Sequence, residues 1–272
     1  MEFINDLVRY SYLQNALWAA ILSGITCGLV GTYIVARRRV FLAGGITHAS
    51  FGGLGAAFYF GAEPLLGAMV AAVAAALGIE WAEGRMQLRE DSAIGILWAV
   101  GMALGALFMS LTPGYTSGDM TAYLFGSIIT VTSTDIVWLA LLTAVVVVGA
   151  MLWLRPVMYV AFDRKFAQSR GIHTRLIGFV MGVLMALAIV LSIRIMGIVL
   201  LIALLTMPVV GANMVSKAYN RIAWIAPVLA VFGNIIGLYL SYIGEVPPGA
   251  AIIFTLSVML FSIKLLTLSR QK

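Results

Sequence analysis

Long apolar stretches alternate with short polar turns along nearly the whole chain. Each apolar stretch is about as long as the ~20 residues that a helix needs to cross a lipid bilayer. The nine stretches cover approximately residues 12–36, 41–61, 62–81, 92–111, 131–154, 174–193, 196–213, 222–243 and 248–267. The pattern predicts an all-α fold, a polytopic membrane helix bundle with nine transmembrane helices.

The basic residues indicate how these helices are oriented in the membrane. With Arg37, Arg38 and Arg39 placed in the cytoplasm and the spans alternating, 15 of the 17 Lys and Arg residues fall on the cytoplasmic side, and only Arg9 and Arg194 do not. This asymmetry favours an odd number of spans, with the N-terminus outside and the C-terminus inside. The alternative is eight helices: the short second span, or one of the closely spaced sixth and seventh, would be re-entrant.

Composition limits the class of protein further. Hydrophobic residues make up 62% of the 272 residues and charged residues 10%, and no polar stretch is long enough to fold alone. We therefore expect one transmembrane domain over residues 1–272. The net charge of +6 belongs to the cytoplasmic loops and does not indicate nucleic-acid binding. Cys27 is the only cysteine, so a disulfide framework and a cysteine metal cluster are excluded.

Motifs of soluble enzymes are missing from the sequence. There is no phosphate-binding Gly-Lys-Ser/Thr loop, no Ser/His/Asp arrangement and no His-Glu-x-x-His pair. We therefore expect that the chain is not an enzyme and does not hydrolyse ATP itself. Uphill transport would take its energy from a partner subunit or from an ion gradient.

His48 is the most informative polar residue. It lies in the second span, within Gly-Ile-Thr-His-Ala-Ser at residues 45–50, where an ionisable side chain is costly. Gly44 and Gly52 are one helical turn to either side on the same face, which predicts open space around the imidazole. Such a site suits a passing ion. Thr47 and Ser50 are further candidates for the pathway.

Structural roles are the alternative for the same helix and for the other polar residues. Gly45, Ala49 and Gly53 form a small-residue stripe, which is typical of a tight helix crossing. Asn234 is in the middle of a span, where a hydrogen bond between helices is the first expectation and a place in the pathway the second. His173 lies at the inner membrane boundary, as a solvated flank.

The longest cytoplasmic loop predicts a short amphipathic helix that ends at Gly171. Phe162, Phe166 and Ala167 share one face, and Asp163 and basic residues occupy the others. Such a helix either lies on the lipid surface or docks into a cytoplasmic partner. The spacing of Ala167 and Gly171 gives a small-residue notch that favours docking.

Together these features resemble the permease subunit of the zinc/manganese/iron family of bacterial ABC importers. The similar segments run in the right order over nearly the whole chain. They are the His48 motif at 45–50, then residues 91–96, 122–126, 132–135, 162–171, 197–208 and 247–250.

The resemblance implies a type II ABC importer-like permease in the bacterial cytoplasmic membrane. It implies a homodimer with two cytoplasmic ATPase subunits and an external metal-carrying solute-binding protein. The pathway would follow the two-fold axis, with His48 as one of a facing pair of metal ligands. Residues 162–171 would be the coupling helix to the ATPase. No resident cofactor is implied, because the divalent metal ion is the cargo.

One departure from the family pattern concerns Gly44. The family often has an Asp at this position, four residues before the histidine, so this chain lacks two carboxylates per dimer. Imidazole suits zinc or iron better than manganese, which prefers oxygen ligands, and zinc is therefore favoured, with iron close behind.

The runner-up function is a secondary transporter or channel for a small cation, but no repeat and no Asp or Glu in mid-span supports it. A purely structural membrane subunit would leave His48 and the amphipathic loop unexplained.

Overall fold

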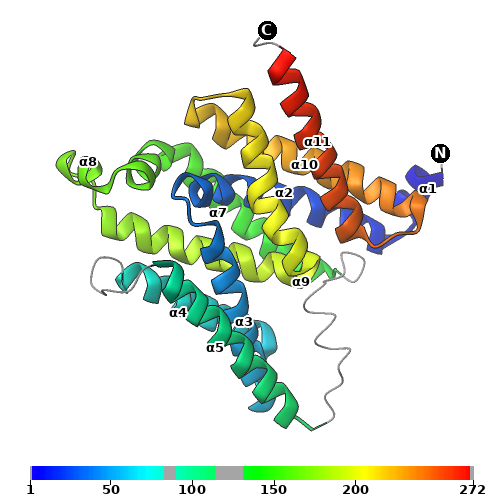
Figure 1. Cartoon of the computed structure of the whole chain (residues 1–272). Helices are drawn as coiled ribbons and strands as arrows, with labels where there is room; N and C mark the ends of the chain where they lie inside the picture. Colours follow the sequence, from blue (N-terminus) through cyan, green and yellow to red (C-terminus); the bar gives the residue numbers. More distant parts are fainter. Residues whose placement is uncertain (1, 83–89, 114–130, 270–272) are drawn as a thin grey trace.

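A computed structural model describes residues 2–82, 90–113 and 131–269. Within these ranges the regular elements are all α-helices (Figure 1). Nine helical segments of the described chain are long and apolar enough to cross a membrane. This confirms the predicted polytopic helix bundle. The predicted cytoplasmic residues Arg85 and Arg89, and the motif at 122–126, lie outside the described ranges.

The helix bounds follow the predicted spans closely, except that α7 continues well past residue 154 and includes Pro156. The helices are α1 (Glu2–Arg9), α2 (Ser11–Ala36), α3 (Val40–Tyr59), α4 (Pro64–Ala82), α5 (Glu90–Leu111), α7 (Ser133–Phe162), α8 (Arg164–Ser169), α9 (Thr174–Val215), α10 (Tyr219–Gly244) and α11 (Pro248–Ser269).

The segment 132–135 has a local structural role at the start of α7. The Thr132 hydroxyl accepts a hydrogen bond from the backbone N–H of Asp135 at 3.3 Å, and the Asp135 carboxylate accepts one from the N–H of Thr132 at 3.1 Å. These reciprocal bonds form a capping box, which satisfies donors that the first helical turn leaves unpaired. Pro248 is the first residue of α11. A backbone N–H at this position would have no partner within the helix, and proline has no backbone N–H.

α9 contains two of the predicted spans. Gly197 breaks the helix between them, with a φ of 75° that favours glycine. Thr174, at the start of α9, accepts a hydrogen bond from Gln168 of α8, and Lys217, just beyond its end, lines a cavity with Phe162 of α7. The first half of α9 therefore crosses the bundle, and the second half returns to the same side, as the yellow-green and yellow segments in Figure 1 show. This supports nine spans rather than eight.

The N-terminus and the end of α10 lie on the side of the bundle opposite to the two ends of α9. The hydroxyl of Tyr242 hydrogen-bonds the carboxylate of Asp6 in α1, a helix that the sequence analysis did not predict. Asn15, in the first turns of α2, donates to the backbone oxygen of Val131 just before α7 at 3.0 Å. These ends share one side of the bundle, as the predicted alternation of spans requires.

Glycines bring the central helices into backbone contact. A Cβ on Gly28 of α2 would overlap Pro227 of α10, and a Cβ on Gly31 would overlap the backbone of Leu205 in α9. In contrast, only 22% of the residues in the apolar stretch of α4, α5, α7 or α11 are buried inside the chain. α2, α3 and the second half of α9 form the interior, and the outer helices present apolar surface to lipid or to another subunit.

Candidate functional site around His48

His48 lies in the middle of α3, at the contact between α3 and α5. The residue is 8% exposed, and its imidazole ring stacks on the indole of Trp98 with centroids 4.3 Å apart and planes 20° apart. The Nδ1 atom is buried and has no hydrogen-bond partner. Buried polar atoms are almost always paired in folded proteins, so an unpaired ring nitrogen is a candidate functional group.

The predicted open space around His48 is wrong. On the Gly44 side, an added Cβ would lie 3.1 Å from the Trp98 ring, so the indole occupies the room that glycine leaves. On the Gly52 side, an added Cβ would lie 2.9 Å from the carbonyl oxygen of Gly101. The glycines of α3 admit α5 rather than an open channel, because their missing side chains let the second helix approach.

The tight helix crossing that was the structural alternative is confirmed. A Cβ on Gly53 would overlap the backbone of Gly67 in α4, and one on Gly45 would lie 3.1 Å from the side chain of Ile94 in α5. Small residues in membrane helices permit this close approach. α3 is therefore held between α4 and α5, and His48 lies within that packed region.

Thr47 and Ser50 donate their hydroxyl hydrogens to their own helix. Thr47 bonds the carbonyl of Ala43 at 2.8 Å, and Ser50 bonds the carbonyl of Thr47 at 2.6 Å. Both side chains are fully buried. In the described part of one chain, no three His, Cys, Asp or Glu side chains come together to hold a metal ion.

Asn234 forms the predicted bond between helices. Its Nδ2 atom donates to the carbonyl oxygen of Ala20 in α2 at 2.7 Å, and the residue is fully buried in α10. Its Oδ1 atom is buried without a partner. The residue joins α10 to α2 and stands apart from the contact between α3 and α5 that surrounds His48.

The cytoplasmic loop contains a helix, α8, shorter than expected. Phe162 is the last residue of α7, and Asp163 is an extended residue whose side chain caps α8 by accepting from the N–H of Phe166 at 3.0 Å. Gly171 has a φ of 75°, and the N–H of Ile172 bonds back to the carbonyl of Ala167 at 3.0 Å. The predicted glycine stop is therefore confirmed as a left-handed helix end.

The two faces of α8 differ from the expected arrangement. Phe162 and Phe166 are about half exposed, whereas Ala167 is fully buried in its own chain. The prediction that Ala167 forms part of a docking notch with Gly171 is therefore wrong, because the Ala167 side chain is buried and cannot contact a partner. The exposed aromatic rings of Phe162 and Phe166 remain available for such a contact.

Sequence reasoning missed Glu80, near the end of α4. Its buried carboxylate accepts hydrogen bonds from Arg37 at 3.2 Å and from Arg39 at 3.3 Å, and it also pairs with Arg164 of α8. Three separate segments therefore meet at one carboxylate: the turn between α2 and α3, the end of α4, and α8. The signal in the sequence was an acidic residue at the end of an apolar span whose cytoplasmic neighbours are almost all basic.

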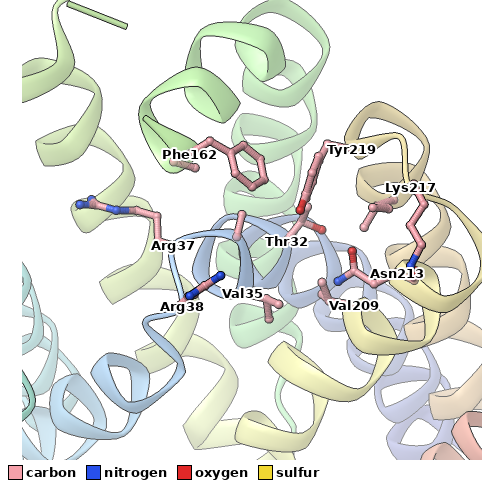
Figure 2. A pocket seen from close by; sticks show the side chains of 12 residues that line it. Thr32, Val35, Arg37, Arg38, Phe162, Val209, Asn213, Lys217 and Tyr219 are labelled. Atoms are coloured by element: carbon pink, nitrogen blue, oxygen red, sulfur yellow. Dashed lines mark hydrogen bonds between the residues drawn. The ribbon is translucent and has the colours of Figure 1, made fainter. Parts of the chain in front are cut away.

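A cavity of about 530 Å³ lies beside this cluster, between the ends of α2, α7 and α10 and the end of α9 (Figure 2). Arg37, Arg38 and Lys217 line it, and its lining includes no carboxylate. The rings of Phe162 and Tyr219 meet above it, with centroids 4.1 Å apart. A positively charged lining repels a divalent cation, so this cavity is a poor metal site.

The sequence matches the family described as the ABC 3 transport family over residues 9–267. The chain belongs to this family. The resemblance noted in the sequence is thereby confirmed, and with it the expectation of a multi-pass membrane permease subunit rather than an enzyme.

Individual proteins match the chain over most of their own length. The manganese transport system membrane protein MntC of Halalkalibacterium halodurans is 34% identical, over 94% of this chain and 88% of that protein. The manganese import system permease protein ScaB of Streptococcus parasanguinis is 29% identical, over 100% and 96%. A chain in the structure of PsaBC from Streptococcus pneumoniae in complex with Fab superposes with a TM-score of 0.85 at 27% identity, over 96% of this chain and 94% of that chain.

Proposed function

We propose that the chain is the permease of an ATP-driven importer that passes a divalent metal ion from an external binding protein to the cytoplasm. The observation that carries the proposal is His48, an imidazole inside a membrane helix with an unpaired buried nitrogen. Imidazole is a common ligand of transition metals. Leaving a buried polar atom unpaired costs about 1–3 kcal/mol, and a metal ion bound at this nitrogen would offset that cost.

The pathway in this proposal needs a second copy of the chain. One imidazole is too few ligands for a metal ion, but two His48 side chains across a two-fold axis, with water as the further ligand, would form a transient site. Trp98 is 39% exposed although it covers His48. Rotation of this indole would expose the imidazole without moving the packed backbone of α3.

Manganese is the first candidate for the cargo, because MntC and ScaB are named for manganese transport. Zinc, with iron after it, is the second candidate, and Gly44 favours it. Position 44 carries no carboxylate, and the Trp98 ring fills the adjoining space. An imidazole site with few oxygen ligands binds zinc or iron in preference to manganese.

Energy would come from a cytoplasmic ATPase that contacts α8. Membership of an ABC transport family supports this source over the secondary transporter or channel. The exposed rings of Phe162, at the end of α7, and Phe166, in α8, form an apolar contact surface. Phe166→Glu would place a charge on that surface, and we expect it to weaken binding of the ATPase while the permease still folds.

Reconstituted transport tests the proposal. The permease, its ATPase and its binding protein are placed in proteoliposomes, and uptake of manganese, zinc and iron is measured singly and in competition, with and without ATP. We expect uptake of the metal to depend on ATP. In the competition assay, we expect one of the three metals to inhibit uptake of the other two most strongly. Uptake of none of them, or uptake that is independent of ATP, would contradict the proposal.

A further inference from the structure

The carboxylate of Glu80 joins parts of the chain that are far apart in sequence. Arg37 and Arg39 reach it from the turn between α2 and α3, and Arg164 reaches it from α8, 84 residues away. Gly178 of α9 closes the remaining side, because a Cβ there would collide with the carboxylate. Glu80 is thus a shared anchor for α4, α8 and the start of α3.

The anchor is buried, which makes it stiff. The Glu80 and Arg37 side chains are each 6% exposed, that of Arg39 is 9% exposed, and that of Arg164 is 27% exposed. Water screens such ion pairs far less than it screens surface pairs. Removing one partner of a buried pair leaves an uncompensated charge, so these groups stay together when neighbouring helices move.

α8 is otherwise held by its neighbours in the sequence. Phe166 packs edge-on against Tyr159 of α7, and Gln168 bonds Thr174 at the start of α9. Arg164 adds a link to a helix on another part of the fold. A movement of α8 therefore reaches Glu80 through Arg164.

The other arm of the anchor leads to His48. Arg39 immediately precedes α3, and it contacts Glu80 at 3.3 Å. Nine positions later on the same helix is His48, about 14 Å along the axis at 1.5 Å per residue. A helix is rigid over this distance, so a displacement at Arg39 shifts the imidazole.

We propose that Glu80 is a positioning residue, which passes movement of α8 through Arg164, Arg37 and Arg39 to the helix that carries His48. The proposal rests on the proposed function, in which α8 contacts the ATPase and His48 contacts the metal. It adds the physical link between those two sites. In this role Glu80 itself would bind neither the metal nor the nucleotide.

The test compares ATP hydrolysis with metal uptake in the reconstituted transporter. Arg164→Gln removes only the α8 arm and leaves Arg37 and Arg39 on Glu80, so it is the decisive variant. We expect it to bind the ATPase and hydrolyse ATP, while the metal imported per ATP falls roughly tenfold, a typical coupling between two sites. Glu80→Gln should have the same effect where it folds, and Arg164→Lys, which keeps the charge, should restore most of the ratio.

Arg155→Gln is the matched control. Arg155 is an exposed arginine near the same end of α7, so its removal deletes an equal charge outside the anchor. We expect the parental ratio of metal to ATP in this variant. A parental ratio in Arg164→Gln would overturn the inference. So would complete loss of ATPase binding, because Arg164 would then be a docking residue.

The parent protein separates this inference from the proposed function. If the parent imports no metal with ATP, the proposed function fails before any variant is compared. If the parent transports and Arg164→Gln retains the parental ratio, the proposed function stands and only the role of Glu80 is lost.

Discussion

The indole ring of Trp98 lies stacked on the imidazole of His48, 4.3 Å away, and the same indole lies against Gly44 one helical turn before it. One side chain of α5 therefore covers both the candidate metal ligand and the position where the family often has an acid. On the proposed function, the size and orientation of this indole would decide how an ion reaches His48.

Replacing Trp98 should change access to His48. Trp98→Ala removes a stacked ring pair, which is worth about 0.5–1.5 kcal/mol beyond the burial of its surface. We expect a modest loss of thermal stability and a changed apparent KM for metal uptake. Trp98→Phe keeps an aromatic face and should stay close to the parent. Identical KM values for all three proteins would show that the stack has no part in transport.

Restoring the acid at position 44 should require a change at Trp98 as well. A Cβ at Gly44 lies 3.1 Å from the ring, so Gly44→Asp alone forces the carboxylate against the indole. In Gly44→Asp with Trp98→Ala the carboxylate has room beside His48, and we expect competition assays to shift towards manganese. Gly44→Ala with Trp98→Ala controls for the added carbon. A shift in that control as large as with Asp would contradict the role of the carboxylate.

Two glycines of α5 make opposite predictions about stability. A Cβ on Gly101 would overlap the backbone of His48, whereas a Cβ on Gly95 would meet nothing within 4 Å. Gly101→Ala should therefore lower stability by about 1–3 kcal/mol through overpacking. Gly95→Ala should raise it by about 0.5–1 kcal/mol, because alanine favours the helix. Thermal unfolding in detergent measures both, and equal melting temperatures would refute the close crossing of α3 and α5.

The spans and the α8 stop could be predicted because apolar runs, Gly171 and the basic turns are local signals. The surroundings of His48 could not, because a single helix shows its own glycines but not the helix that fills them. Gly44 and Gly52 look like empty space until Trp98 and Gly101 of α5 are placed beside them. Glu80 was missed for the same reason, since Arg37 and Arg164 meet it only in three dimensions.

Asn234 should prove to be a structural residue. Asn234→Leu keeps the length of the side chain and its branching at Cγ and removes the bond to Ala20, and bonds between membrane helices contribute only about 0.6 kcal/mol on average. We expect a stability change below about 1 kcal/mol and an unchanged order of metal preference. A changed order of preference would place Asn234 in the pathway instead.

The most direct test of the account is metal uptake by His48→Ala beside His173→Ala. These are the 2 histidines of the chain, one buried against Trp98 and one exposed at the start of α9. Both variants should assemble with the ATPase. We expect the rate of metal uptake by His48→Ala to fall at least roughly tenfold, because even residues that only hydrogen-bond to a metal ligand contribute that much. We expect His173→Ala to transport like the parent. Parental uptake of manganese, zinc and iron by His48→Ala would make His48 a packing residue and contradict the central claim.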